Sequence, residues 1–159
     1  MIKVTVIAMG KIKEKFLTDA VNEYSKRLSR YCSLDIAEIA PVLLPENPSQ
    51  SEIAAALEKE AELIRRRIPK NADVTAMCVE GRQMSSEAFA KKIQSGCNCG
   101  KPQCFIIGSS YGLDEGLKRE CRSRMSVSEM TFPHRLFRIM LLEQIYRAFK
   151  INEGGTYHK

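Results

Sequence analysis

Residues 103–112 read QCFIIGSSYG, residues 126–134 read SVSEMTFPH and residues 133–150 read PHRLFRIMLLEQIYRAFK. The first run predicts a short buried strand, Cys104–Ile107, that ends in a glycine turn. The second predicts another strand over Ser126–Thr131, and the third predicts a helix with Pro133 in its first turn. Turns of this kind beside an apolar helix indicate a ligand pocket at strand ends, in the last third of the chain.

The helix over residues 133–150 is apolar on almost every side. Its apolar residues are Leu136, Phe137, Ile139, Met140, Leu141, Leu142, Ile145, Tyr146, Ala148 and Phe149. A helix of this composition is buried on more than one side. We expect the sheet to cover one side and a second copy of the chain to cover the other, which predicts a symmetric homodimer. Glu143 and Arg147 are four residues apart on this helix and can pair.

The earlier part of the chain alternates between strand and helix patterns. Strands are predicted at Ile2–Ala8, Leu34–Ile39 and Val74–Val79, and helices at Glu14–Arg30, from Ser49 or Ser51 to about Arg67, and from Ser85 or Ser86 to about Ser95. This order predicts an α/β fold, with a parallel sheet covered by helices on both faces. The unbroken apolar run Val74–Val79 is typical of a strand buried on both faces. A chain of 159 residues suits a single domain, residues 1–159.

Composition favours a cytoplasmic protein with a polyanionic partner. Twenty-five Lys and Arg residues against 19 Asp and Glu residues give a net charge of +6. This excess favours RNA or DNA as a partner, although a merely basic soluble protein fits as well. No signal peptide pattern and no apolar run long enough to cross a membrane is present.

Six cysteines are expected to be thiols in a cytoplasmic protein. Cys97, Cys99 and Cys104 follow a Cys-x-Cys-x4-Cys spacing, which is not a usual zinc spacing, and no histidine lies near them in sequence. We therefore predict no metal site and interpret this segment as a surface loop between a helix and a strand.

Three predicted strand ends carry groups suited to a ligand. They are Glu80-Gly81, Gly108–Gly112 and Met130–His134. Gly108 and Gly112 let the backbone approach a ligand, but the spacing is neither a dinucleotide fingerprint nor a P-loop. The two histidines are His134 and His158, and Tyr157-His158 at the end of the chain has groups that can stack on and bind an unpaired nucleobase.

These motifs together resemble a known family. The matching segments are residues 4–14, 80–86, 105–113, 128–134, 138, 143–148 and 157–159. The pattern resembles the ribosomal large-subunit methyltransferase H family, the SPOUT-class enzymes that methylate N3 of a pseudouridine in 23S rRNA. The resemblance spans the whole chain.

The resemblance implies a deep trefoil knot at about residues 103–159, an obligate homodimer, and S-adenosylmethionine as methyl donor. The residues implied to contact the donor are Met77, Gly108, Val127, Ser128, Glu129, Met130, Thr131 and Phe132. The implied substrate is a pseudouridine in the helix 69 loop of 23S rRNA, within assembled ribosomes.

We assign catalytic roles on this basis. Arg147 would bind the imide oxygens or orient the base, His158 would accept the N3 proton directly or through water, and Tyr157 would stack on the base. One departure is Ser109, where the family often has a second glycine. Two alternatives remain open: a non-enzymatic ribosome-binding protein of SPOUT fold, and a tRNA methyltransferase.

Overall fold

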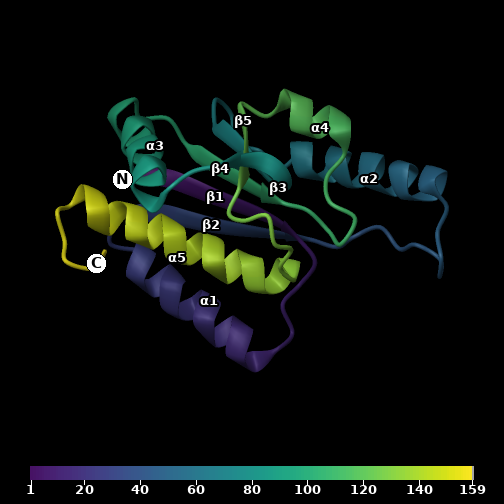
Figure 1. The fold of residues 1–159 in the computed structure, drawn as a ribbon, viewed down its shortest axis with the longest axis horizontal. Helices are drawn as coiled ribbons and strands as arrows, with labels where there is room; N and C mark the ends of the chain where they lie inside the picture. Colours follow the sequence, from purple (N-terminus) through teal and green to yellow (C-terminus); the bar gives the residue numbers. More distant parts are fainter. Residues whose placement is uncertain (159) are drawn as a thin grey trace.

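A computed structural model describes residues 1–158, and in it five parallel strands form one sheet with helices on both faces (Figure 1). The strands are β1 Ile2–Met9, β2 Cys32–Ile39, β3 Asp73–Gln83, β4 Gln103–Ile107 and β5 Ser123–Ser126. The helices are α1 Lys15–Leu28, α2 Gln50–Arg65, α3 Ser86–Asn98, α4 Glu115–Glu120 and α5 His134–Asn152. The predicted α/β fold and parallel sheet are confirmed.

The strand order β2-β1-β4-β3-β5 places the first and last thirds of the chain side by side. β4 lies between β1 and β3 and pairs with both in parallel. Because every pairing is parallel, all five carboxyl ends meet at one edge of the sheet. This edge is where an open α/β sheet binds ligands.

Alternating side chains of the central strands feed two apolar cores. Val4, Val6 and Phe105 point to the face covered by α1, α3 and α5. Ile7 and Ile106 point to the opposite face, which is covered by α2 and α4 (Figure 1). Burial on both faces explains why these strands read as nearly unbroken apolar runs.

The fifth strand lies earlier than predicted. β5 covers Ser123–Ser126, whereas the predicted strand was Ser126–Thr131. Beyond Ser126, side chains bond to the nearby backbone: the Ser126 hydroxyl donates to the Ser128 carbonyl, and the Met130 amide donates to the Ser128 hydroxyl. Such local bonds compete with strand pairing, so the segment forms a turn at the sheet edge.

β3 is longer than predicted and is not buried along its whole length. The strand continues to Gln83, and Val79 is 54% exposed, so the prediction of burial on both faces is wrong at that residue. The cause is an irregularity in the pairing with β5 between Met77 and Arg82. Helix α4 was not predicted, because six residues that include Gly116 give too short a pattern.

Helix α5 begins at His134, with Pro133 as its N-cap residue rather than in its first turn. Leu141, Leu142 and Ile145 are fully buried against the sheet, and α1 and α3 pack along the sides of the helix. The apolar surface of α5 that stays uncovered within one chain is therefore narrower than the sequence suggested. Among the helices of residues 1–158, none has the length and apolar character needed to cross a membrane.

Candidate active site

A cavity of about 1000 Å³ opens at the carboxyl ends of β3, β4 and β5. Helix α2 forms one wall through Ile53 and Leu57, and Phe137 of α5 lines the cavity as well. Seven of the eight residues implied to contact a donor line this strand-end cavity: Met77, Gly108, Val127, Ser128, Met130, Thr131 and Phe132. The eighth, Glu129, is exposed and is not among the lining residues.

The turn after β4 is tight, which explains its glycines. A Cβ atom at Gly108 would lie 2.3 Å from the Gly112 carbonyl oxygen. Gly112 has a φ of +85°, in the left-handed region that favours glycine, and its amide donates to the Ser109 carbonyl at 2.9 Å. Ser109 is half-buried and lines the cavity, so its side chain belongs to the wall of the turn.

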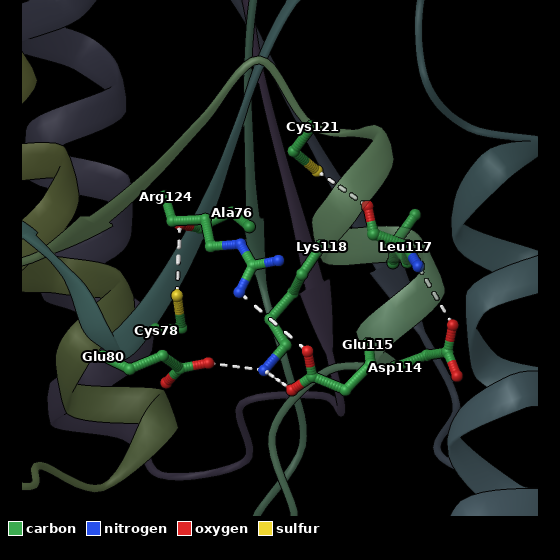
Figure 2. Close-up of polar contacts among 9 residues, drawn as sticks. All are labelled: Ala76, Cys78, Glu80, Asp114, Glu115, Leu117, Lys118, Cys121 and Arg124. Carbon is green, nitrogen blue, oxygen red and sulfur yellow. Dashed lines mark hydrogen bonds and ion pairs between the residues drawn. The ribbon is translucent and has the colours of Figure 1, made fainter.

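A cluster of charged side chains forms the wall between β3 and α4. The Lys118 ammonium contacts the carboxylates of Glu80 and Glu115, and Arg124 of β5 lies 3.9 Å from the second oxygen of Glu115 (Figure 2). Asp114 caps α4 by accepting a hydrogen bond from the Leu117 amide at 3.0 Å. The hydrogen bond from Lys118 holds the pKa of Glu80 below its usual range.

His134 lines the same cavity at the start of α5. Burial, together with the positive charges of Arg135 and Arg138, lowers the pKa of His134. Arg138 itself is buried and ties α5 to the sheet, donating to the Gly10 carbonyl at 2.9 Å and to the Glu38 carboxylate at 2.7 Å. His134 is therefore held in its neutral form near pH 7.

The predicted catalytic residues form a second cluster at the other end of α5. Glu143 accepts hydrogen bonds from Arg147 at 2.7 and 3.0 Å and from the Tyr157 hydroxyl at 3.2 Å. The Arg147 guanidinium also lies over the Tyr157 ring, 4.8 Å from its centre. Burial and the Glu143 carboxylate raise the pKa of Tyr157 to about 12, so this phenol stays neutral.

Glu143, Arg147, Tyr157 and His158 form the tail cluster, and His158 connects it to α3. Its Nδ1 lies 3.2 Å from Arg147 Nη1, and its Nε2 lies 2.7 Å from the Glu87 carboxylate. A guanidinium can only donate, so Nδ1 accepts and Nε2 carries the proton given to Glu87. Hydrogen bonds from its own amide and from His158 lower the pKa of Glu87 to about 2. Within one chain, Nδ1 of His158 can accept a proton from another molecule only after its hydrogen bond with Arg147 breaks.

The two groups of predicted site residues lie apart in one chain. Arg147 lies thirteen positions after His134 on α5, which is roughly 20 Å at the helical rise. A second cavity of about 420 Å³ lies between them. Val127 and Ser126 line both cavities, and Glu143 of the tail cluster lines the second.

Comparisons with known proteins identify the family of this chain. The family model described as "Predicted SPOUT methyltransferase" matches residues 2–158. A ribosomal RNA large subunit methyltransferase H from Clostridium beijerinckii is 48% identical over 157 residues, covering 98% of this chain and 99% of the relative. One from Clostridium perfringens is 46% identical over 160 residues, with the same coverage. The chain belongs to the ribosomal RNA large subunit methyltransferase H family of SPOUT methyltransferases.

A solved structure shows the same fold at low identity. It is that of a probable methylase family protein from Haemophilus influenzae Rd KW20, with a TM-score of 0.62 and 9% identity over 100% of this chain and 72% of that chain. This likeness concerns the fold alone. The family membership agrees with the resemblance that the motifs indicated.

Several charged residues in the two clusters of this SPOUT chain escaped prediction from sequence. Lys118 and Glu115 sit on the unpredicted helix α4, and Glu87 lies on α3, far from His158 in sequence. Among these contacts, only that of Glu143 with Arg147 could be predicted locally, because the two residues are four positions apart on one helix. All six cysteines are free thiols. Among residues 1–158, no group of three or more His, Cys, Asp or Glu side chains is placed to hold a metal ion.

Proposed function

We propose that this chain transfers a methyl group from S-adenosylmethionine to N3 of a pseudouridine in the helix 69 loop of 23S rRNA, in assembled ribosomes in the cytoplasm. One observation carries the proposal: seven of the residues implied to contact the donor line a single cavity at the strand ends. The relatives' names, which specify a ribosomal RNA large subunit methyltransferase, support the substrate class.

The cavity suits a cationic donor in size and charge. Its volume of about 1000 Å³ leaves room for a nucleoside with an amino-acid chain. The Asp, Glu, Lys and Arg side chains in its lining are three carboxylates, Glu80, Asp114 and Glu115, and one ammonium, Lys118. The surplus of negative charge favours a sulfonium over the neutral thioether that remains after transfer.

S-adenosylmethionine supplies an electrophilic methyl group, so the protein must position the base and manage one proton. N3 of the pseudouridine loses its proton and forms a bond to the methyl carbon, and the carbon–sulfur bond breaks. Arg147 is suited to binding the imide oxygens, where negative charge develops. His158 is suited to accepting the N3 proton at Nδ1 once Arg147 has moved to the substrate, and Tyr157 to stacking on the base.

We further propose that two chains assemble so that the tail cluster of one completes the strand-end cavity of the other. The separation of roughly 20 Å along α5 between His134, in the cavity lining, and Arg147 supports this arrangement. Within one chain, Arg147, Tyr157 and His158 are not among the residues that line the strand-end cavity. We also propose that residues 103–159 form the trefoil knot of the SPOUT class and that the chain is a single domain. Lys159, the last residue of the predicted tail, lies outside the described residues.

The net charge of +6 supports an rRNA partner. The basic residues around α1 that are suited to phosphate contacts include Lys11, Lys13, Lys26 and Arg30, which are exposed. Lys15 and Arg27 instead pair with Asp19 and Glu23 on the same helix. Binding to ribosomes is expected to weaken as salt concentration rises.

Labelled-methyl transfer to ribosomes and to bulk tRNA tests the function. We expect transfer to ribosomes only, and removal of residues 157–159 should abolish it while calorimetry shows unchanged affinity for S-adenosylmethionine. The point variant His158→Asn should behave like the truncation. Transfer to tRNA would instead identify a tRNA methyltransferase, and absence of donor binding would favour a non-enzymatic ribosome-binding protein. Full activity of the truncated chain would remove the tail from the mechanism.

A further inference from the structure

Strand β3 carries a bulge at the edge of the strand-end cavity. In the pairing of β3 with β5, Met77 and Arg82 both align with Met125, so residues 78–81 stand outside the ladder. Cys78, Val79 and Glu80 of this β3 bulge all line the cavity. Bulges beside active sites re-aim side chains, and here the bulge turns part of a central strand into cavity wall.

The far end of the β3 bulge is fixed by a close backbone contact. A Cβ atom at Gly81 would lie 2.5 Å from the Met125 carbonyl carbon, so only glycine fits there. The side of the bulge that faces α4 is held by an ion pair instead. Glu80 reaches across to Lys118 on α4 (Figure 2).

Lys118 has its side chain only 8% exposed. Burial alone would lower its pKa, but hydrogen bonds to Glu115 and Glu80 outweigh that effect and raise the pKa, so the ammonium stays charged. A buried ammonium requires its carboxylate partners, because an unpaired buried charge is costly. Glu115 is a partner from the same helix, 2.5 Å away, whereas Glu80 is the partner from the sheet.

We propose that Lys118 is a positioning residue that holds the β3 bulge in place through Glu80 and thereby shapes the donor wall of the cavity. Movement of the bulge away from α4 would leave the buried ammonium with Glu115 alone. The ion pair therefore favours the conformation in which residues 78–80 face the cavity. The link to the methyl donor rests on the proposed function, whereas the restraint on the bulge does not.

Hydrogen exchange in the donor-free protein tests the restraint directly. We expect Lys118→Met to speed exchange about tenfold in the part of β3 that pairs with β5 directly after the bulge, residues 82 and 83, with β1 unchanged. Glu80→Gln, at a half-exposed side chain, should give the same local effect and keeps the test available if Lys118→Met does not fold. Arg119→Met is the matched control, because Arg119 is an exposed cation on the same helix. This variant should leave exchange of residues 82 and 83 unchanged.

Calorimetry with S-adenosylmethionine tests the link to the site. We expect Lys118→Met and Glu80→Gln each to raise Kd about tenfold, with the double variant no worse than either single one, because both act through one pair. Lys118→Arg should restore part of the affinity, and Arg119→Met should bind normally.

The outcomes separate the two proposals. Unchanged exchange of residues 82 and 83 in both single variants would overturn the role of Lys118, whatever the ligand. Faster exchange with unchanged donor affinity would overturn its link to the donor wall. A wild-type protein that does not bind S-adenosylmethionine would overturn the proposed function and leave the exchange result to decide whether Lys118 holds the bulge.

Discussion

Gly108 shows how a single residue sets the shape of the strand-end cavity. The backbone of Gly112 occupies the space that any side chain at residue 108 would need. The backbone at the two ends of the turn is therefore in close contact, and residues 108–112 all line the cavity. The glycine is thus required by a close approach of backbone to backbone, which local sequence alone does not reveal.

Gly108→Ala should open this turn. We expect a loss of about 1–3 kcal/mol in the free energy of unfolding, because the new methyl group overlaps the Gly112 carbonyl, and a weaker affinity for S-adenosylmethionine. Urea unfolding and calorimetry measure the two effects. Ser110→Ala, at an exposed position in the same turn, is the control for stability and should leave the free energy of unfolding unchanged. Normal stability and affinity of Gly108→Ala would contradict the geometry of the turn.

His134 should make stability depend on pH. Its pKa in the folded chain is lower than the ordinary 6.5, so the unfolded chain binds more protons in this range. The stabilisation is complete above about pH 6.5 and is lost as pH falls through the folded pKa, with a slope of at most about 1.4 kcal/mol per pH unit. Thermal or urea unfolding between pH 7 and pH 5 should show a flatter slope for His134→Gln. An equal slope in both proteins would show that His134 is not responsible.

At the scale of elements, α2 matters because it supplies one wall of the cavity. The helix begins with a complete capping box, in which the Ser49 hydroxyl accepts from the Glu52 amide at 3.2 Å and the Glu52 carboxylate accepts from the Ser49 amide at 3.1 Å. The sequence offered Ser49 or Ser51 as the cap, and the structure uses Ser49.

Ser49→Ala should lower the free energy of unfolding by about 1 kcal/mol, because the Glu52 amide at the start of α2 loses its hydrogen-bond partner. Ser49→Asp retains an acceptor and should keep most of the stability. Urea unfolding compares the two variants with the parent chain. A Ser49→Ala protein as stable as its parent would show that the cap contributes nothing.

At the scale of the whole molecule, α5 keeps an apolar strip that its own chain does not fully cover. Leu136 is 40% exposed, and Ile139 and Met140 are half-buried beside the second cavity. Met130, in the loop that leads to α5, is 72% exposed. The strip is consistent with the proposed homodimer, although α1 and α3 already cover the flanks of the helix.

Met140→Glu should weaken self-association at least tenfold, because it places a charge in the proposed dimer interface. Sedimentation equilibrium measures this as a shift from dimer towards monomer, and methyl transfer should fall with it. Leu63→Glu, on the opposite face of the sheet at a position that is 37% exposed, is the matched control and should remain dimeric. A wild-type chain that is monomeric at every concentration would contradict the proposed assembly.

Much of the fold was readable from the sequence because the relevant signals are local. The apolar runs of β1 and β4 and the periodicity of α1, α2 and α3 identified those elements close to their observed bounds. The end of β5 was harder to predict, because Ser126 and Ser128 bond to nearby backbone. Helix α4 was missed because it is too short to show a period. The residues predicted to contact the donor came from the family resemblance rather than from periodicity.

The sequence by itself determined that strands alternate with helices, that the sheet is parallel and covered on both faces, and that groups suited to a ligand follow the strands, since each depends on residues close together in the chain. Only the tertiary structure decided that residues 78–81 leave the ladder and that residues 78–80 line the cavity. It also decided that Lys118 faces Glu80 and that His158 bonds to Glu87. These pairs join residues 38 and 71 positions apart, so their contacts exist only once the sheet has brought the elements together.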